Sequence, residues 1–216
     1  MKEFFQRGDS LRTKICGLTG REDAELALAA GADALGFNFF SGSKRFLDFE
    51  SHRDWIRDLD PKAARVAVVV NPDEPLLTAL RDSGCFDAIQ FHGDEAPEFC
   101  ARAGFPTWIR AVRVRDEGSL DEALQFDTPY LLFDAWSPGA YGGTGKRLDW
   151  DLIRGFVLAH PDRQVILAGG LTPPNVREAV RIVRPHAVDV ASGVELDPGR
   201  KNEYLVREFL QAARSA

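Results

Sequence analysis

The amino-acid sequence predicts an α/β fold, a single (β/α)8 TIM barrel. A short apolar run followed by an amphipathic segment recurs eight times along the 216 residues. These runs lack polar alternation, which is typical of parallel strands that are covered on both faces. No linker or change in composition interrupts the pattern, so we expect one domain over residues 1–216, with residues 1–12 as an N-terminal extension.

The predicted strands are short and separated by one helical segment each. In chain order they are Thr13–Cys16, Ala34–Asn38, Val66–Val70, Ala88–Phe91, Thr107–Val112, Tyr130–Asp134, Gln164–Ala168 and Ala187–Val190. The alternative is an open doubly wound sheet, which usually has fewer strands and a G-x-G-x-x-G fingerprint after the first one. Here the first turn reads Cys16-Gly17-Leu18-Thr19-Gly20. The sequence therefore favours the closed barrel.

Three of the intervening helices carry clear start signals, in which a capping side chain precedes an apolar stripe or a proline occupies the first turn. We expect these helices to start at the capping-box pair Thr19 and Glu22, at Asn71 before Pro72, and at Thr172 before Pro173.

Composition limits the class of partner and the compartment. The net charge is −6 and no long basic block occurs, so a nucleic-acid-binding surface is not predicted. No stretch has the roughly 18 apolar residues of a membrane span. The three cysteines, Cys16, Cys85 and Cys100, are odd in number and lack C-x-x-C spacing, which is typical of a reducing compartment. With no signal-peptide pattern in residues 1–12, we expect a cytoplasmic protein.

The active site of such a barrel lies at the carboxyl ends of its strands. Polar residues or glycines occur at each of these predicted ends. They are Cys16, Asn38, Asn71, Gln90 with His92, Arg113, Asp134, Gly169 with Gly170, and Ser192 with Gly193.

Cys16 and Asp134 are the best candidates for catalysis among these residues, although each also has a structural interpretation. Cys16 is either a small packing residue or a base, which would require a lowered pKa and hence a nearby cation or helix N-terminus. Asp134 is either a solvated turn residue or a general acid. His92 is as well suited to orienting a neighbour as to catalysis. No H-x-H pair or carboxylate cluster indicates a metal site.

Glycines and basic residues in the predicted loops indicate an anionic ligand. Gly169 and Gly170 follow the seventh strand, and Asp189, Ser192 and Gly193 lie at the end of the eighth, which is the usual phosphate site of this fold. Arg45, in the loop after the second strand, could hold a substrate carboxylate or be merely solvated. The glycine-rich loop 137–148 is not a Walker A motif, and we interpret it as a lid or a loose loop.

Taken together, these segments resemble the phosphoribosylanthranilate isomerase family of tryptophan biosynthesis. The resemblance covers residues from about Thr13 to Lys201, in the family's order. The matching pieces are Lys14-Ile15-Cys16-Gly17-Leu18-Thr19, Gly31-Ala32-Asp33-Ala34-Leu35-Gly36-Phe37, Gln90-Phe91-His92-Gly93-Asp94-Glu95, Leu131-Leu132-Phe133-Asp134, Gly142-Gly143-Thr144-Gly145-Lys146, Ala168-Gly169-Gly170-Leu171 and Asp189-Val190-Ala191-Ser192-Gly193-Val194-Glu195.

The resemblance implies an Amadori rearrangement of N-(5′-phosphoribosyl)anthranilate, without a metal or cofactor. It implies that Asp134 is the general acid, that Cys16 is the general base and that Arg45 holds the anthranilate carboxylate. Gln90 and His92 are then substrate-binding residues. The implied phosphate site consists of Gly169, Gly170, Asp189, Ser192 and Gly193. The chain departs from the family pattern at Lys44, where the family usually has proline, and at Ala135, where it often has Ser or Thr.

Two alternatives remain at this point. One is a dual-substrate sugar-phosphate isomerase that also acts on a histidine-pathway intermediate, although such enzymes usually have two carboxylates as their acid–base pair. The other is a barrel that binds a sugar phosphate without catalysis. In every case the expected partner is a small anionic sugar phosphate, and the sequence leaves the oligomeric state open.

Overall fold

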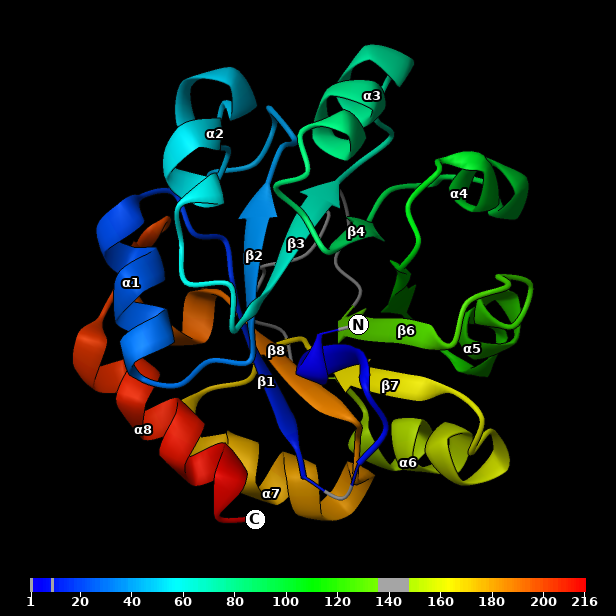
Figure 1. The fold of residues 1–216 in the computed structure, drawn as a ribbon. Helices are drawn as coiled ribbons and strands as arrows, with labels where there is room; N and C mark the ends of the chain where they lie inside the picture. The colour runs from blue at the N-terminus through cyan, green and yellow to red at the C-terminus, as the bar shows by residue number, and fades with distance from the viewer. Residues whose placement is uncertain (1, 9, 136–147) are drawn as a thin grey trace.

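The computed structural model describes residues 2–8, 10–135 and 148–216, and a closed barrel of eight strands forms its centre (Figure 1). Each strand pairs in parallel with the next one in the chain, and the last closes onto the first. The strands are β1 Arg12–Cys16, β2 Ala34–Asn38, β3 Ala64–Val69, β4 Ala88–Phe91, β5 Trp108–Val114, β6 Tyr130–Ala135, β7 Gln164–Leu167 and β8 Ala187–Val190. This confirms the predicted (β/α)8 barrel.

A helix follows each strand and packs on the outside of the barrel (Figure 1). The helices are α1 Arg21–Ala29, α2 Phe49–Arg57, α3 Glu74–Asp82, α4 Pro97–Arg102, α5 Glu117–Ala123, α6 Trp150–Ala159, α7 Pro173–Val183 and α8 Glu203–Arg214. Four short elements are added to this pattern: the 3-10 helices η1 Glu3–Phe5 and η2 Ser192–Val194, and the antiparallel strands β9 Glu195–Asp197 and β10 Arg200–Lys201. No helix in the described ranges has the length and apolar character needed to cross a membrane.

One of the three predicted helix starts is correct. Thr172 caps α7, and its side chain and that of Asn175 form a capping box. The start predicted at Thr19 is wrong, because Gly20 is the N-cap of α1 and the Thr19 hydroxyl instead donates to the carbonyl of Gly199, 2.7 Å away. The side chain of Thr19 therefore links the loop after β1 to the turn between β9 and β10.

The start predicted at Asn71 is also wrong. Asp73 caps α3 by accepting a hydrogen bond from the N–H of Leu76. Asn71 has a φ of +45°, in the left-handed region that asparagine tolerates better than most residues. Its N–H donates to Glu95 at 2.7 Å, and its side-chain oxygen accepts from the N–H of Asp94 at 2.8 Å. Asn71 thus joins two barrel loops instead of capping a helix.

The N-terminal extension closes the barrel at the end where the strands begin. The η1 helix lies across the middle of the ring of strands (Figure 1), and Phe4 and Phe5 are 1% and 2% exposed. The Phe5 ring lies 5.0 Å from the ring of Tyr130, whose hydroxyl donates to the Phe5 carbonyl at 2.9 Å. His186 Nε2 lies 2.7 Å from the carbonyl oxygen of Phe4. The first residues therefore belong to the barrel's inner core.

Replacing Phe5 with alanine is expected to lower the free energy of unfolding by about 3–5 kcal/mol, because it leaves a cavity in this inner core. Urea unfolding followed by circular dichroism measures the change. Leu158→Ala is the matched control: its side chain is 68% exposed, so we expect a change within about 0.5 kcal/mol. Equal stabilities of Phe5→Ala and the wild type would contradict the conclusion that the N-terminal extension belongs to the barrel's inner core.

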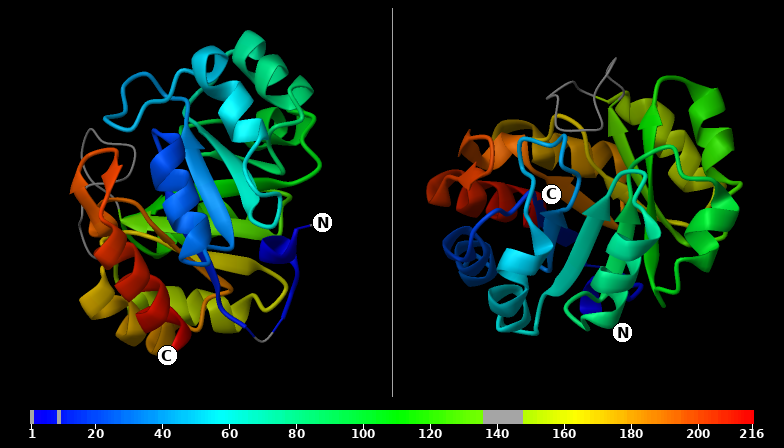
Figure 2. Two further views of the ribbon diagram at one scale, coloured as in Figure 1. Left: turned by 60° about the vertical axis from the view of Figure 1, so that its left-hand side comes forward. Right: turned by 90° about the horizontal axis from the view of Figure 1, so that it is seen from above.

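The opposite end of the barrel is open to the loops that follow the strands. Figure 2 shows the N-terminus at one end of the barrel, and the loop after β2 and the β9–β10 hairpin toward the other. Strand residues alternate between the helix-covered outside and the barrel interior. The polar strand residues that face inward at this open end therefore define the candidate site.

Candidate active site

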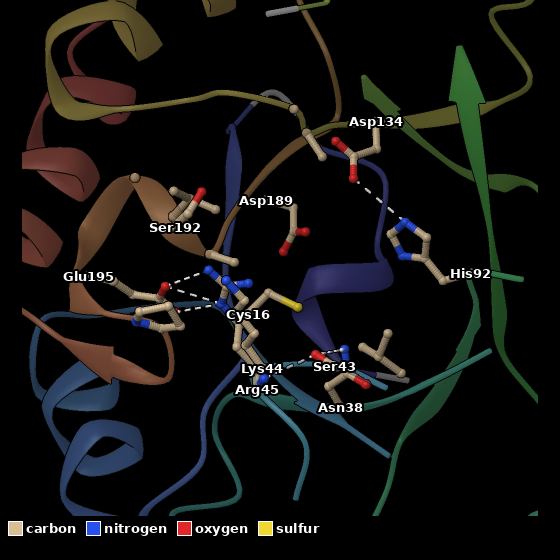
Figure 3. Close-up of a pocket in the computed structure, with 18 of the residues that line it drawn as sticks. Cys16, Asn38, Ser43, Lys44, Arg45, His92, Asp134, Asp189, Ser192 and Glu195 are labelled. Atoms are coloured by element: carbon tan, nitrogen blue, oxygen red, sulfur yellow. Dashed lines mark hydrogen bonds and ion pairs between the residues drawn. The ribbon is translucent and has the colours of Figure 1, made fainter. Parts of the chain in front are cut away.

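A pocket of about 810 Å³ occupies the carboxyl ends of the strands (Figure 3). That volume is within the range of small-molecule sites. Polar residues with inward-facing positions on five strands or their ends line it: Cys16, Asn38, Gln90, His92, Asp134 and Asp189. The loops after β2, β7 and β8 complete the wall. The structure thus brings together every residue to which the sequence assigned a catalytic or binding role, since Arg45, Gly169, Gly170, Ser192 and Gly193 also line this pocket. Of the polar strand ends, Asn71 and Arg113 do not line it.

Cys16 ends β1 with its sulfur in the pocket (Figure 3). Burial raises the pKa of the thiol, and Asp189 raises it further, whereas Lys14 and Lys201 lower it; the net shift is upward. The condition set by the sequence interpretation, a lowered pKa, is therefore not met. The cation that it required is present as Lys14, but desolvation outweighs its effect on the pKa of the thiol.

Asp134 lies at the end of β6 and points toward His92 (Figure 3). Its Oδ1 accepts the N–H of Ala135 at 2.8 Å, and its Oδ2 lies 3.6 Å from His92 Nε2. His92 Nδ1 in turn lies 3.0 Å from Gln90 Nε2. Gln90 lies on β4 and His92 just after it. Their side chains thus form a row that leads to the Asp134 carboxyl group. The imidazole thus lies beside the Asp134 carboxyl group, whose hydrogen bond comes from the N–H of Ala135.

Arg45 reaches into the pocket from the loop after β2, and Glu195 at the start of β9 holds it there. Glu195 accepts hydrogen bonds from the Arg45 Nε at 2.8 Å and the Nη2 at 2.6 Å. The Cδ of Arg45 lies so close to Gly17 that a side chain at that position would collide with it. Glu195 therefore holds one edge of the guanidinium group, and Arg45 Nη1 has no hydrogen-bond partner among the described residues.

Lys201, a buried residue on β10, forms an ion pair with Glu195. Its Nζ lies 2.7 Å from Glu195 Oε1 and 2.6 Å from the carbonyl oxygen of Cys16. Burial alone would raise the pKa of Glu195, but Arg45 and Lys201 more than offset it, so the net shift is downward. Burial lowers the pKa of Lys201, and Glu195 opposes this shift. The three side chains form one buried network that links β1 to the β9–β10 hairpin.

The loops after β7 and β8 lie against each other on one side of the pocket. Gly169 and Gly170 have φ values of +80° and +65°, which favour glycine. The side chain of Asn175 donates to the Gly170 carbonyl at 2.9 Å and so orients that peptide. A side chain on Gly193 would collide with the carbonyl of Leu171. Gly193 lies in η2, a short extra helix at the position where barrels of this type bind phosphate.

Asp189 lines the pocket, but its carboxylate is bound by Lys14 at 2.8 Å. Its place in the implied phosphate site stays a prediction, and the observed contact is with a cation beneath the pocket. The loop interpreted as a lid, 137–148, lies outside the described residues except for Leu148.

Three charged residues at or beside the pocket were not singled out from the sequence: Glu195, which lines it, and the buried Lys14 and Lys201. Lys14 sits inside a predicted buried strand, where an unpaired charge is costly, and Asp189 sits inside another. Opposite charges in two strands that are neighbours in a closed barrel are a usable signal. Glu195 and Lys201 carry no such signal, because their meeting depends on the β9–β10 hairpin. Among the described residues, no group of three or more His, Cys, Asp or Glu side chains could hold a metal ion.

The fold and this pocket define a (β/α)8-barrel enzyme, in which a thiol and a carboxyl group face one cavity beside an arginine and two loops that carry glycines. The model of the family described as N-(5′-phosphoribosyl)anthranilate (PRA) isomerase matches residues 13–212. The chain belongs to this family.

Individual relatives agree with the family match. An N-(5′-phosphoribosyl)anthranilate isomerase of Geobacter metallireducens is 45% identical over 205 residues, covering 95% of this chain and 100% of the relative. One from Pelobacter propionicus is 43% identical over 204 residues, covering 94% and 96%. The crystal structure of the Thermotoga maritima phosphoribosyl anthranilate isomerase matches with a TM-score of 0.84 at 38% identity, covering 95% of this chain and 100% of that one.

A solved complex of such an isomerase with reduced 1-(o-carboxyphenylamino)-1-deoxyribulose 5-phosphate matches with a TM-score of 0.81 at 35% identity. It covers 95% of this chain and 100% of that chain. The family match supports the isomerase over the two alternatives left open by the sequence.

Proposed function

We propose that this chain converts N-(5′-phosphoribosyl)anthranilate to 1-(2-carboxyphenylamino)-1-deoxyribulose 5-phosphate in tryptophan biosynthesis, with Asp134 as general acid and Cys16 as general base. The observation that carries the assignment is that Cys16 and Asp134, on non-adjacent strands β1 and β6, line one pocket together with Arg45. An acid and a base that face one cavity can act on two different atoms of the same bound molecule.

The rearrangement needs two proton transfers before tautomerisation. The Asp134 carboxylic acid gives a proton to the ribose ring oxygen, and the bond from that oxygen to C1′ breaks to leave an iminium. The Cys16 thiolate then takes the proton from C2′, which the adjacent iminium makes acidic, and an enolamine forms. The enolamine becomes the ketone when the C2′ hydroxyl loses its proton and C1′ gains one. No oxidant or reductant takes part, because substrate and product are isomers.

The remaining pocket residues suit the two anionic ends of this substrate. The loops after β7 and β8 provide backbone N–H groups for the phosphate, with Gly169, Gly170, Ser192 and Gly193 allowing close approach. The bound edge of Arg45 is fixed by Glu195, so its Nη1 edge is available for the anthranilate carboxylate. Gln90 and His92, which line the pocket beside Asp134, are the other substrate-binding residues. The partner we propose is thus a small anionic sugar phosphate.

Replacing Arg45 with glutamine is expected to weaken binding of the reduced product analogue by about 10- to 150-fold, the value of one charge-assisted contact. Glu195 keeps its ion pair with Lys201 in this variant, so no buried carboxylate is left without a partner. Isothermal titration calorimetry with the analogue measures the change. Arg181→Gln, an equal change of charge at an exposed position on α7, is the control and should bind as the wild type does. Equal affinities of the two variants would contradict the carboxylate clamp.

The cysteines support a proposal about the compartment. Cys16, Cys85 and Cys100 are all free and buried. Proteins in reducing compartments keep such thiols unpaired. Together with a substrate from amino-acid biosynthesis, this supports a cytoplasmic location.

A further inference from the structure

A fully buried lysine lies beneath the pocket and has no role in the reaction proposed above. Lys14 is 0% exposed, and its Nζ lies 2.8 Å from Asp189 Oδ1. The two residues stand directly opposite each other in the pairing of β1 with β8. Lysines are almost never fully buried unless they are paired. Burying this ion pair therefore costs desolvation free energy. Lys14 lies one inward-facing residue below Cys16 on β1.

The same lysine lies next to the thiol of Cys16. Lys14 and Cys16 are two residues apart on β1, so both side chains face the barrel interior. On the neighbouring strand, Gly36 is paired with Cys16 and leaves room for both groups. A Cβ at Gly36 would lie 2.7 Å from the Cys16 sulfur and 3.0 Å from the Lys14 Nζ. The ammonium group and the sulfur therefore share the space that a side chain at Gly36 would fill.

Four charged groups act on Cys16: Lys14 on its own strand, Asp189 on β8, Lys201 on β10 and Arg45 in the loop after β2. After burial, Lys14 has the largest effect on the pKa of the thiol, and it lowers it. The lysine itself stays charged: burial lowers its pKa, but Asp189 and Cys16 more than offset this, so the net shift is upward.

We propose that Lys14 is a positioning residue for catalysis, whose ammonium group, held by Asp189, favours the thiolate form of Cys16. Asp189 is then the anchor of this cation in addition to any contact with the phosphate loop. The inference rests on the proposed function only in giving the thiolate a use, because the ionisation of Cys16 can be measured without substrate. A purely structural ion pair could be replaced without any effect on the ionisation of the thiol.

The test is the rate of alkylation of Cys16 by iodoacetamide as a function of pH, since this reagent reacts with the thiolate. Peptide mass spectrometry reports Cys16 separately from Cys85 and Cys100. In Lys14→Met we expect the alkylation curve to move to higher pH by at least about one unit, which slows the reaction about tenfold at a fixed pH below the midpoint. The rise of kcat/KM with pH should move in the same direction.

Lys14→Gln is the second variant. It removes the cation that lowers the pKa of the thiol, while its amide can still donate to Asp189, so we expect its alkylation curve to move to higher pH as well. It keeps the inference testable if Lys14→Met does not fold, as judged by circular dichroism. Curves that coincide with the wild type, or that move to lower pH, would overturn the inference. A wild type without turnover whose alkylation responds as expected would overturn the proposed function and leave this inference standing.

Discussion

Replacing Asp134 with asparagine is expected to lower kcat for phosphoribosylanthranilate by about 10²- to 10⁴-fold, the usual value of a general acid. Asparagine has nearly the same shape as aspartic acid, and its oxygen can still accept the N–H of Ala135, which now lies 2.8 Å from Asp134 Oδ1. It has no acidic proton to give to the ribose ring oxygen. The loss should therefore fall on kcat, while binding of the reduced product analogue changes little.

Asp127→Asn is the matched control for this variant, because Asp127 is exposed and precedes the same strand. It should keep the kcat of the wild type, as measured by steady-state kinetics under the same conditions. If Asp134→Asn kept more than about a tenth of the wild-type kcat, Asp134 would not be the general acid, since such a group contributes at least about 10²-fold.

Replacing Cys16 with serine is expected to cause a loss of similar size, again about 10²- to 10⁴-fold in kcat. The hydroxyl group fits the space of the thiol but does not ionise at the pH of the assay. In the wild type, burial raises the pKa of Cys16, so the thiolate fraction grows as the pH increases toward and beyond the ordinary value of about 8.5. We therefore expect kcat/KM of the wild type to increase with pH on the alkaline side, and that of Cys16→Ser to stay flat there.

Cys100→Ala is the control, because it removes a buried thiol outside the pocket. Its kcat should match the wild type even if its stability is lower. A Cys16→Ser variant that retained the alkaline rise of kcat/KM would assign that rise to another group and remove Cys16 from the role of base.

The barrel could be predicted from sequence because its strands are local, apolar and regularly spaced. The predicted and observed ends of β2, β4 and β8 coincide. The two wrong helix starts fail for a common reason. Thr19 and Asn71 are good capping residues, but their side chains bond to partners distant in sequence, at Gly199 and Asp94. Tertiary contacts thus overrode a local preference that is real.

The site could be predicted in part because a barrel gathers the ends of its strands at one face. That rule alone brings Cys16, His92 and Asp134 together, and all three line the pocket. It gives no information on which charges lie next to a given group. The pKa of Cys16 depends on Lys14, Asp189 and the degree of burial, which are set by register and packing. The ionisation of the thiol could therefore not be predicted from the sequence.

The packing role of the first residues could also not be predicted from the sequence. Two phenylalanines in a polar segment do not indicate which residues their rings will pack against. Phe4 and Phe5 fill the barrel interior only because the strands leave a ring of small residues there, among them Ala34, Ala64 and Ala187.

The most direct test of the whole account is the fluorescence decay of freshly generated phosphoribosylanthranilate, followed with the wild type, Cys16→Ser and Asp134→Asn in parallel. We expect rapid decay with the wild type and almost none above background with either variant. A wild type that binds the reduced product analogue without accelerating the decay would contradict it, and would make the chain a sugar-phosphate-binding barrel without catalysis.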